Sequence, residues 1–121
     1  MQKAFMGAAT LAMAAFAAWP ASAAGTVRIG IILPYSGQFA DTAEQLDDGI
    51  KLYMQQHGDT VAGKKIVVIR KDTGGINPAL TKRLAQELLV REHADILAGF
   101  AMTPNAFAGG DGGNVLVAAP G

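Results

Sequence analysis

Short apolar runs alternate with amphipathic stretches through the middle of this chain. Three runs, at residues 27–33, 65–70 and 96–100, are rich in isoleucine, leucine and valine and are followed by polar or glycine-containing segments. A short apolar run followed by turn-forming residues predicts a strand that is buried on both faces. Strands of this kind are typical of parallel sheets that helices cover on both sides.

The stretches between the runs have the spacing of helices. In residues 41–58 apolar side chains recur every three or four positions, so charged side chains are expected on the opposite, solvated face. The apolar set is Ala43, Leu46, Ile50, Tyr53 and Met54, and the charged set is Glu44, Asp47, Asp48 and Lys51. A second helix is predicted from Pro78 to about His93, because Asn77 is a favourable cap and proline fits the first helical position.

The alternation of strands and helices predicts βαβ units and a parallel sheet. Right-handed crossovers place the first strand between the other two, in the order 2-1-3. A third helix should begin at Pro104 with Thr103 as its cap, but residues 109–113 contain four glycines in five positions, which oppose a helix. The expected fold is therefore a partial three-layer α/β sandwich whose third crossover is unfinished.

Residues 1–23 form a segment of a different kind. Lys3 precedes an alanine-rich apolar run that ends at Pro20, and residues 21–23 read Ala-Ser-Ala. This pattern is typical of a secretory signal peptide, so we expect export and cleavage after Ala23. The alternative is a membrane-spanning helix, for which the run is short. Because the sequence contains no cysteine to carry a lipid anchor, the expected location is the periplasm.

Composition argues against several classes of function. Ten basic side chains balance ten acidic ones, whereas a nucleic-acid-binding protein has a basic excess. Without cysteine there is no disulfide, thiolate metal site or cysteine nucleophile. His57 and His93 each end a predicted helix, where the helix dipole explains them better than a metal does. The glycine run lacks the Gly-Lys-Ser/Thr of a phosphate loop, so we expect neither a cofactor nor a metal.

The triplet Asp72-Thr73-Gly74 matches the catalytic triplet of aspartic proteases. That mechanism needs two aspartates that share one proton. Such proteases are built almost entirely of strands, whereas this triplet lies between a predicted strand and a predicted helix. A polar loop between strand and helix is therefore the favoured interpretation, and an aspartic protease centred on Asp72 is the alternative.

The pair Thr103-Pro104 follows the third strand, at the edge of the sheet where ligands of open α/β proteins bind. The free N–H groups and the dipole of a helix amino terminus favour a carboxylate or phosphate there. The hydroxyl of Thr103 is able to donate to the same anion. An ordinary cap that binds only its own helix explains the pair equally well.

Five segments have a recognisable order and spacing. They are Ile-Gly-Ile-Ile-Leu-Pro-Tyr-Ser-Gly at 29–37, the helix at 46–57, Gly-Lys-Lys-Ile at 63–66, Lys-Asp-Thr-Gly at 71–74 and Gly-Phe-Ala-Met-Thr-Pro-Asn-Ala at 99–106. Together they resemble the amino-terminal part of a type I periplasmic solute-binding protein, in the branch similar to leucine/isoleucine/valine-binding proteins of ABC importers. The last segment is similar to members that bind amino acids and to relatives that bind aromatic carboxylates.

The resemblance covers residues 26 to about 107. It implies two α/β lobes joined by a hinge, with a small molecule trapped between them and no catalysis. The implied partners are a small carboxylate ligand and the permease and ATPase subunits of an importer. By position, Met102 and Thr103 would hold the ligand carboxylate. The implied contacts from neighbouring loops are Tyr35, Gln38, Phe39 and Thr42, with a weaker claim for Asp72.

The chain departs from the family after the third helix begins. In the family that helix continues, and a fourth strand leads to the rest of the first lobe, the hinge and the second lobe. We therefore expect a signal peptide at 1–23, a partial amino-terminal lobe at 24–108 and a divergent Gly-rich tail at 109–121. The tail composition fits an out-of-frame reading of a GC-rich gene, so the expected function is that of a solute-binding component present here as an incomplete fragment.

Overall fold

The computed structural model describes residues 25–110, and the predicted signal peptide and residues 111–121 of the predicted tail lie outside this part. The strands are β1 (Thr26–Leu33), β2 (Thr60–Val61), β3 (Lys64–Asp72) and β4 (Ile96–Gly99). The helices are α1 (Ala40–His57), α2 (Pro78–Val90) and α3 (Thr103–Gly110). Within residues 25–110, none of these helices has the length and apolar character needed to cross a membrane.

The sheet has the order β2-β3-β1-β4. β1 pairs in parallel with β3 on one side and with β4 on the other, which confirms the predicted order of the three parallel strands. β2 is an additional antiparallel strand at the edge that was not predicted. Ala62 and Gly63 both have positive φ and turn the chain back on itself between β2 and β3. A strand of two residues is too short to show a hydrophobic period.

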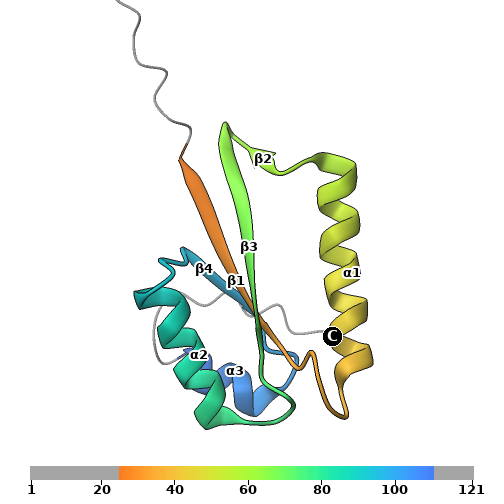
Figure 1. Ribbon diagram of the computed structural model, residues 1–121, viewed down its shortest axis with the longest axis vertical. Coiled ribbons are helices and arrows are strands. Elements are labelled where there is room, and N and C mark those ends of the chain that lie inside the picture. The colour runs from red at the N-terminus through yellow and green to blue at the C-terminus, as the bar shows by residue number, and fades with distance from the viewer. Residues whose placement is uncertain (1–24, 111–121) are drawn as a thin grey trace, which may run out of the picture.

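Helices cover both faces of the sheet, as Figure 1 shows, with α1 on one side and α2 and α3 on the other. Successive side chains of β1 point to opposite faces. Ile31 and Leu33 pack in a cluster with Ala43 of α1, whereas Ile32 packs in a second cluster with Leu88 of α2. The predicted three-layer α/β sandwich is therefore confirmed.

The predicted inner face of α1 is wrong in part. Leu46 and Tyr53 are 37% and 59% exposed, whereas Asp47, predicted on the solvated face, is only 4% exposed. Beyond its first residue, the less exposed positions of α1 are 43, 47, 50 and 54. Their spacing of three and four residues places them on one face of the helix. Asp47 is buried because basic side chains neutralise its charge, as described below.

α3 differs from its prediction at both ends. The N–H of Ala106 donates to the carbonyl of Met102 at 3.0 Å, so Met102 rather than Thr103 holds the cap position. The helix runs to Gly110, which includes the first two glycines of the predicted tail. A Cβ at Gly109 would overlap the ring of buried Phe100, 2.7 Å from its Cζ atom. Packing therefore requires this glycine.

Candidate functional site

Three loops meet at the carboxyl edge of the sheet. Leu33, the last residue of β1, is the register partner of Asp72, and Ile32 is the partner of Gly99 at the end of β4. The loops that follow, residues 34–39, 73–77 and 100–102, therefore start at the same edge, which lies at the lower end of Figure 1. This is the edge where open α/β sheets bind ligands.

Asp72 joins the first two of these loops. Its Oδ1 accepts hydrogen bonds from the N–H of Gly74 at 2.7 Å and from the N–H of Ser36 at 3.2 Å. Burial raises the pKa of Asp72, but the hydrogen bonds from Ser36 and Gly74 outweigh that effect and hold the pKa below the usual aspartate value. The carboxylate predicted as a weak ligand contact is thus used within the protein, as an ionised acceptor between two loops.

The same two loops approach each other closely at Gly37. Its φ is +83°, and a Cβ there would lie 2.6 Å from the carbonyl oxygen of Gly74. Only glycine adopts this conformation and allows this approach without strain. The N–H of Thr73 also donates to the carbonyl of Leu33 at 3.0 Å, which extends the contact between the two strand ends.

The loop between β4 and α3 has an unusual backbone. Phe100 and Ala101 have φ values of +69° and +60°, a conformation that costs a residue other than glycine on the order of 1–3 kcal/mol. The turn is held by the Phe100 ring, which is fully buried, and by the N–H of Phe100, which donates to Ile32 O at 2.5 Å. Ala101 packs against the same apolar cluster as Tyr35, so this loop lies beside the β1–α1 loop.

The turn presents the first residues of α3 at the site. Thr103 is exposed and Met102 is half-buried. The first N–H groups of a helix have no partner within the helix, and Pro104 has no N–H at all. The available donors are therefore the N–H and the hydroxyl of Thr103 and the N–H of Asn105. Two backbone donors, one hydroxyl and the helix dipole form an arrangement that suits an anion.

Asn105 was missed by the sequence analysis. Its side chain is fully buried, and Oδ1 accepts from the N–H of Asn77 at 2.9 Å. Its Nδ2 donates to the carbonyl of Gly75 at 2.9 Å. α3 is thereby attached to the β3–α2 loop. The available signal was a polar residue in the first turn of a predicted helix.

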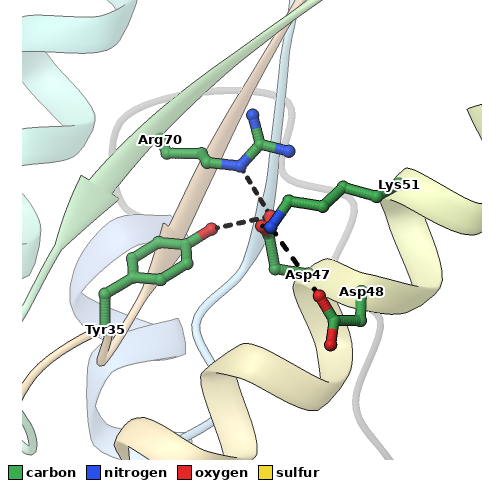
Figure 2. A network of polar contacts seen from close by, with 5 residues as sticks. All are labelled: Tyr35, Asp47, Asp48, Lys51 and Arg70. Atoms are coloured by element: carbon green, nitrogen blue, oxygen red, sulfur yellow. Dashed lines mark hydrogen bonds and ion pairs between the residues drawn. The ribbon is translucent and has the colours of Figure 1, made fainter.

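A charged cluster fixes Tyr35, as Figure 2 shows. Oδ1 of Asp47 accepts from Nε of Arg70 at 2.6 Å and from the Tyr35 hydroxyl at 3.2 Å. Lys51 pairs with Oδ2 of Asp47 at 2.9 Å and with Asp48 at 3.7 Å. Tyr35, predicted as a ligand contact, therefore directs its hydroxyl at α1. The cluster itself was not predicted.

The cluster shifts the acidity of both partners of that hydrogen bond. Burial, followed by the nearby charge of Asp47, raises the pKa of Tyr35 to about 12. Burial also raises the pKa of Asp47, but hydrogen bonds from Arg70 and Lys51 outweigh it and keep the pKa below the usual value. At neutral pH Tyr35 is therefore a donor and Asp47 an ionised acceptor.

The other predicted contacts lie where the β1–α1 loop enters α1. Gln38 and Thr42 are exposed, and Phe39 is half-buried at the cap position of α1. The structure thus brings the loops of Tyr35, Asp72 and Thr103 to one edge. Residues 25–110 contain no group of three histidine, aspartate or glutamate side chains arranged to hold a metal ion.

Comparison with known proteins identifies relatives of the whole described part of the chain. Residues 26–114 match the family model described as Periplasmic binding protein. The chain is 41% identical over 100 residues to Leu/Ile/Val-binding protein homolog 6 of Brucella abortus, an alignment that covers 83% of this chain. The alignment covers 25% of that relative, so this chain spans about a quarter of the length of the curated relatives it matches.

Solved structures give the same result. A solute-binding protein of an ABC transporter from Rhodopseudomonas palustris BisB5, in complex with 3,4-dihydroxybenzoic acid, superposes with a TM-score of 0.73 and 47% identity. The match covers 78% of this chain and 27% of that one. A solute-binding protein from R. palustris in complex with 4-hydroxybenzoate has a TM-score of 0.69 and 36% identity, over 71% of this chain and 23% of that one.

Proposed function

Since the chain belongs to the periplasmic binding protein family, we propose that it supplies part of the ligand site of a substrate-binding component of an ABC transporter. The ligand in this proposal is a small carboxylate, either an amino acid or an aromatic acid. Aromatic acids are the first ones to test, because two of the similar solved proteins contain hydroxybenzoic acids.

The observation that carries the proposal is the position of the first turn of α3. It lies at the carboxyl edge of the sheet, next to the β1–α1 loop, with the hydroxyl of Thr103 exposed. A carboxylate would accept the hydrogen bonds of the Thr103 N–H and hydroxyl and of the Asn105 N–H. The N–H of Met102 donates to the carbonyl of Phe100, so Met102 would contact the body of the ligand instead of its carboxylate. Gln38, Phe39 and Thr42 would contact the ligand body too, and Tyr35 and Asp72 would support these residues from within the lobe.

The proposed role is binding and delivery without turnover. The ligand would be collected in the periplasm after export and passed to a membrane permease powered by an ATPase. The lobe described here contacts only one side of a ligand, and ligand sites bury most of the ligand surface. We therefore expect the affinity to reside in a longer protein that supplies the second side.

A chimera tests this proposal directly. Residues 26–110 replace the matching segment of the R. palustris protein that was solved with 3,4-dihydroxybenzoic acid, and calorimetry measures the affinity for that ligand. We expect the chimera to bind it, and Thr103→Val to weaken binding about tenfold, because one hydrogen bond to a charged group contributes roughly 1.5–3 kcal/mol.

Thr60→Val is the matched control, since Thr60 is an exposed threonine in the edge strand β2, at the opposite end of β3 from the site. It should leave the affinity unchanged. A folded chimera that does not bind the acid would contradict the ligand class. Equal affinities in the two valine variants would contradict the assignment of Thr103.

A further inference from the structure

Asn105 connects α3 to the β3–α2 loop through a side chain that solvent does not reach. It lies in the first turn of α3, yet both ends of its amide bond to the β3–α2 loop, to Asn77 N–H and to Gly75 O, each at 2.9 Å. A buried amide is costly unless both its donor and its acceptor are satisfied. An apolar side chain of similar size would fill the space but would not fix the distance between the loops.

The link continues from Asn105 into α2. Asn77 caps that helix, because its Oδ1 accepts from the N–H of Leu80 at 3.0 Å. The carbonyl of Asn77 accepts from the N–H and the hydroxyl of Thr81 at 2.9 and 2.8 Å. The amino termini of α2 and α3 are therefore held at a fixed separation by one amide.

The link also continues in the other direction, into the β1–α1 loop. Gly74, next to Gly75 in the chain, donates its N–H to Asp72, and the same carboxylate oxygen accepts from the N–H of Ser36. Hydrogen bonds thus run from α3 through the β3–α2 loop to the loop that begins α1. The first turn of α3, the β3–α2 loop and the β1–α1 loop therefore belong to one network.

We propose that Asn105 is a positioning residue that holds the first turn of α3, the β3–α2 loop and the β1–α1 loop in a single arrangement. For its effect on a ligand the proposal rests on the proposed function, because the first turn of α3 is there the carboxylate site. The coupling between the loops is a property of the unliganded chain and is tested without a ligand.

The substitution Asn105→Asp changes one hydrogen bond and almost no volume. One carboxyl oxygen still accepts from the N–H of Asn77, but the other faces the carbonyl of Gly75 and bonds to it only when protonated. A buried carboxyl has a pKa above the ordinary value of about 4. The variant should keep the wild-type arrangement at low pH and lose it as the pH rises through that raised pKa.

The experiment follows backbone amide signals of the 121-residue chain by NMR as the pH is raised from 4 toward 8. In Asn105→Asp we expect one transition, seen at Asn77 and, with the same midpoint, at Gly74 and Ser36. Above it, loss of the bond to the Gly75 carbonyl should make opening of the link about tenfold more frequent. Hydrogen exchange at Asn77 should then be faster than in the wild type at the same pH by that factor. Gly58, at the far end of α1, is the control and should not respond.

The wild-type chain should show no such transition, because the hydrogen bonds from Ser36 and Gly74 keep the pKa of Asp72 below the ordinary range. A transition at Asn77 that leaves Ser36 unchanged would overturn the proposal and reduce Asn105 to a local contact.

If Asn105→Asp does not fold at any pH, Asn105→Ser replaces it. Signals at Ser36 and Gly74 that match the wild type would then overturn the proposal, and displaced signals at both would support it. These measurements use no ligand, so a chimera that fails to bind would contradict the proposed function without changing the conclusion about Asn105.

Discussion

Gly109→Ala tests whether the end of α3 is packed as the structure shows. The added methyl group would overlap the Phe100 ring, 2.7 Å from Cζ and 3.2 Å from Cδ1. Phe100 is 0% exposed, so its ring has little room to move away. The variant therefore sets a clash against the usual benefit of alanine in a helix.

The magnitude follows from two opposing effects. Alanine in place of glycine stabilises a helix interior by up to about 1 kcal/mol. Overpacking a buried site costs about 1–3 kcal/mol. Gly110→Ala is the matched control, because no described atom lies within 4 Å of its added methyl group. We expect Gly109→Ala to be less stable than Gly110→Ala by about 1–3 kcal/mol, the cost of the clash.

Thermal unfolding followed by circular dichroism measures the difference. For a domain of this size each 1 kcal/mol shifts Tm by about 4–8 °C, so the two variants should be clearly separated. Phe100→Leu should restore part of the loss in Gly109→Ala, because the shorter side chain vacates the ring position. Equal Tm values for the two alanine variants would refute this packing. Residues 109–110 would then belong to the divergent tail, as the sequence predicted, and not to α3.

Substitutions at Asp47 and Asp72 test the roles of these two acids, with Asp48 as a control. Asp47→Asn should lower the free energy of unfolding by roughly 1.5–3 kcal/mol in a urea titration, whereas Asp48→Asn, with an exposed side chain, should change it by less than about 0.5 kcal/mol. Because folding lowers the pKa of Asp47, its stabilisation is complete above about pH 4 and should disappear as the pH falls further, in wild type but not in Asp47→Asn. In a peptide hydrolysis assay neither wild type nor Asp72→Asn should show turnover, and wild-type activity lost in Asp72→Asn would favour the aspartic protease alternative.

The parallel sheet was predictable because its signals are local. Each of β1, β3 and β4 is a short apolar run, and crossover handedness alone sets their order. The start of α2 was predicted equally well, since Asn77 does accept from the N–H of Leu80. The edge strand β2 escaped because two residues show no pattern.

Asp47 was placed on the wrong side of α1 because the interaction that buries it is not local. Its position among Ala43 and Ile50 fits the inner face, but charge argues for solvent. The interaction that overrides charge comes from Arg70, 23 residues away and on β3. A partner at that distance in the chain is known only once helix and strand are packed together.

The meeting of three loops at one edge of the sheet was predictable, but the contacts that join them were not. The rule that ligands bind at the carboxyl edge selected the loops after β1, β3 and β4 without reference to any single side chain. From the sequence, Gly37 had only a turn-forming role, Asp72 had a weak claim to ligand contact, and Asn105 was missed. The long-range partners of these residues are backbone groups, which carry no sequence signal. The structure shows that these residues join the loops. Thr103 is exposed beside them, and its proposed contact with a carboxylate would depend on the rigidity that they provide.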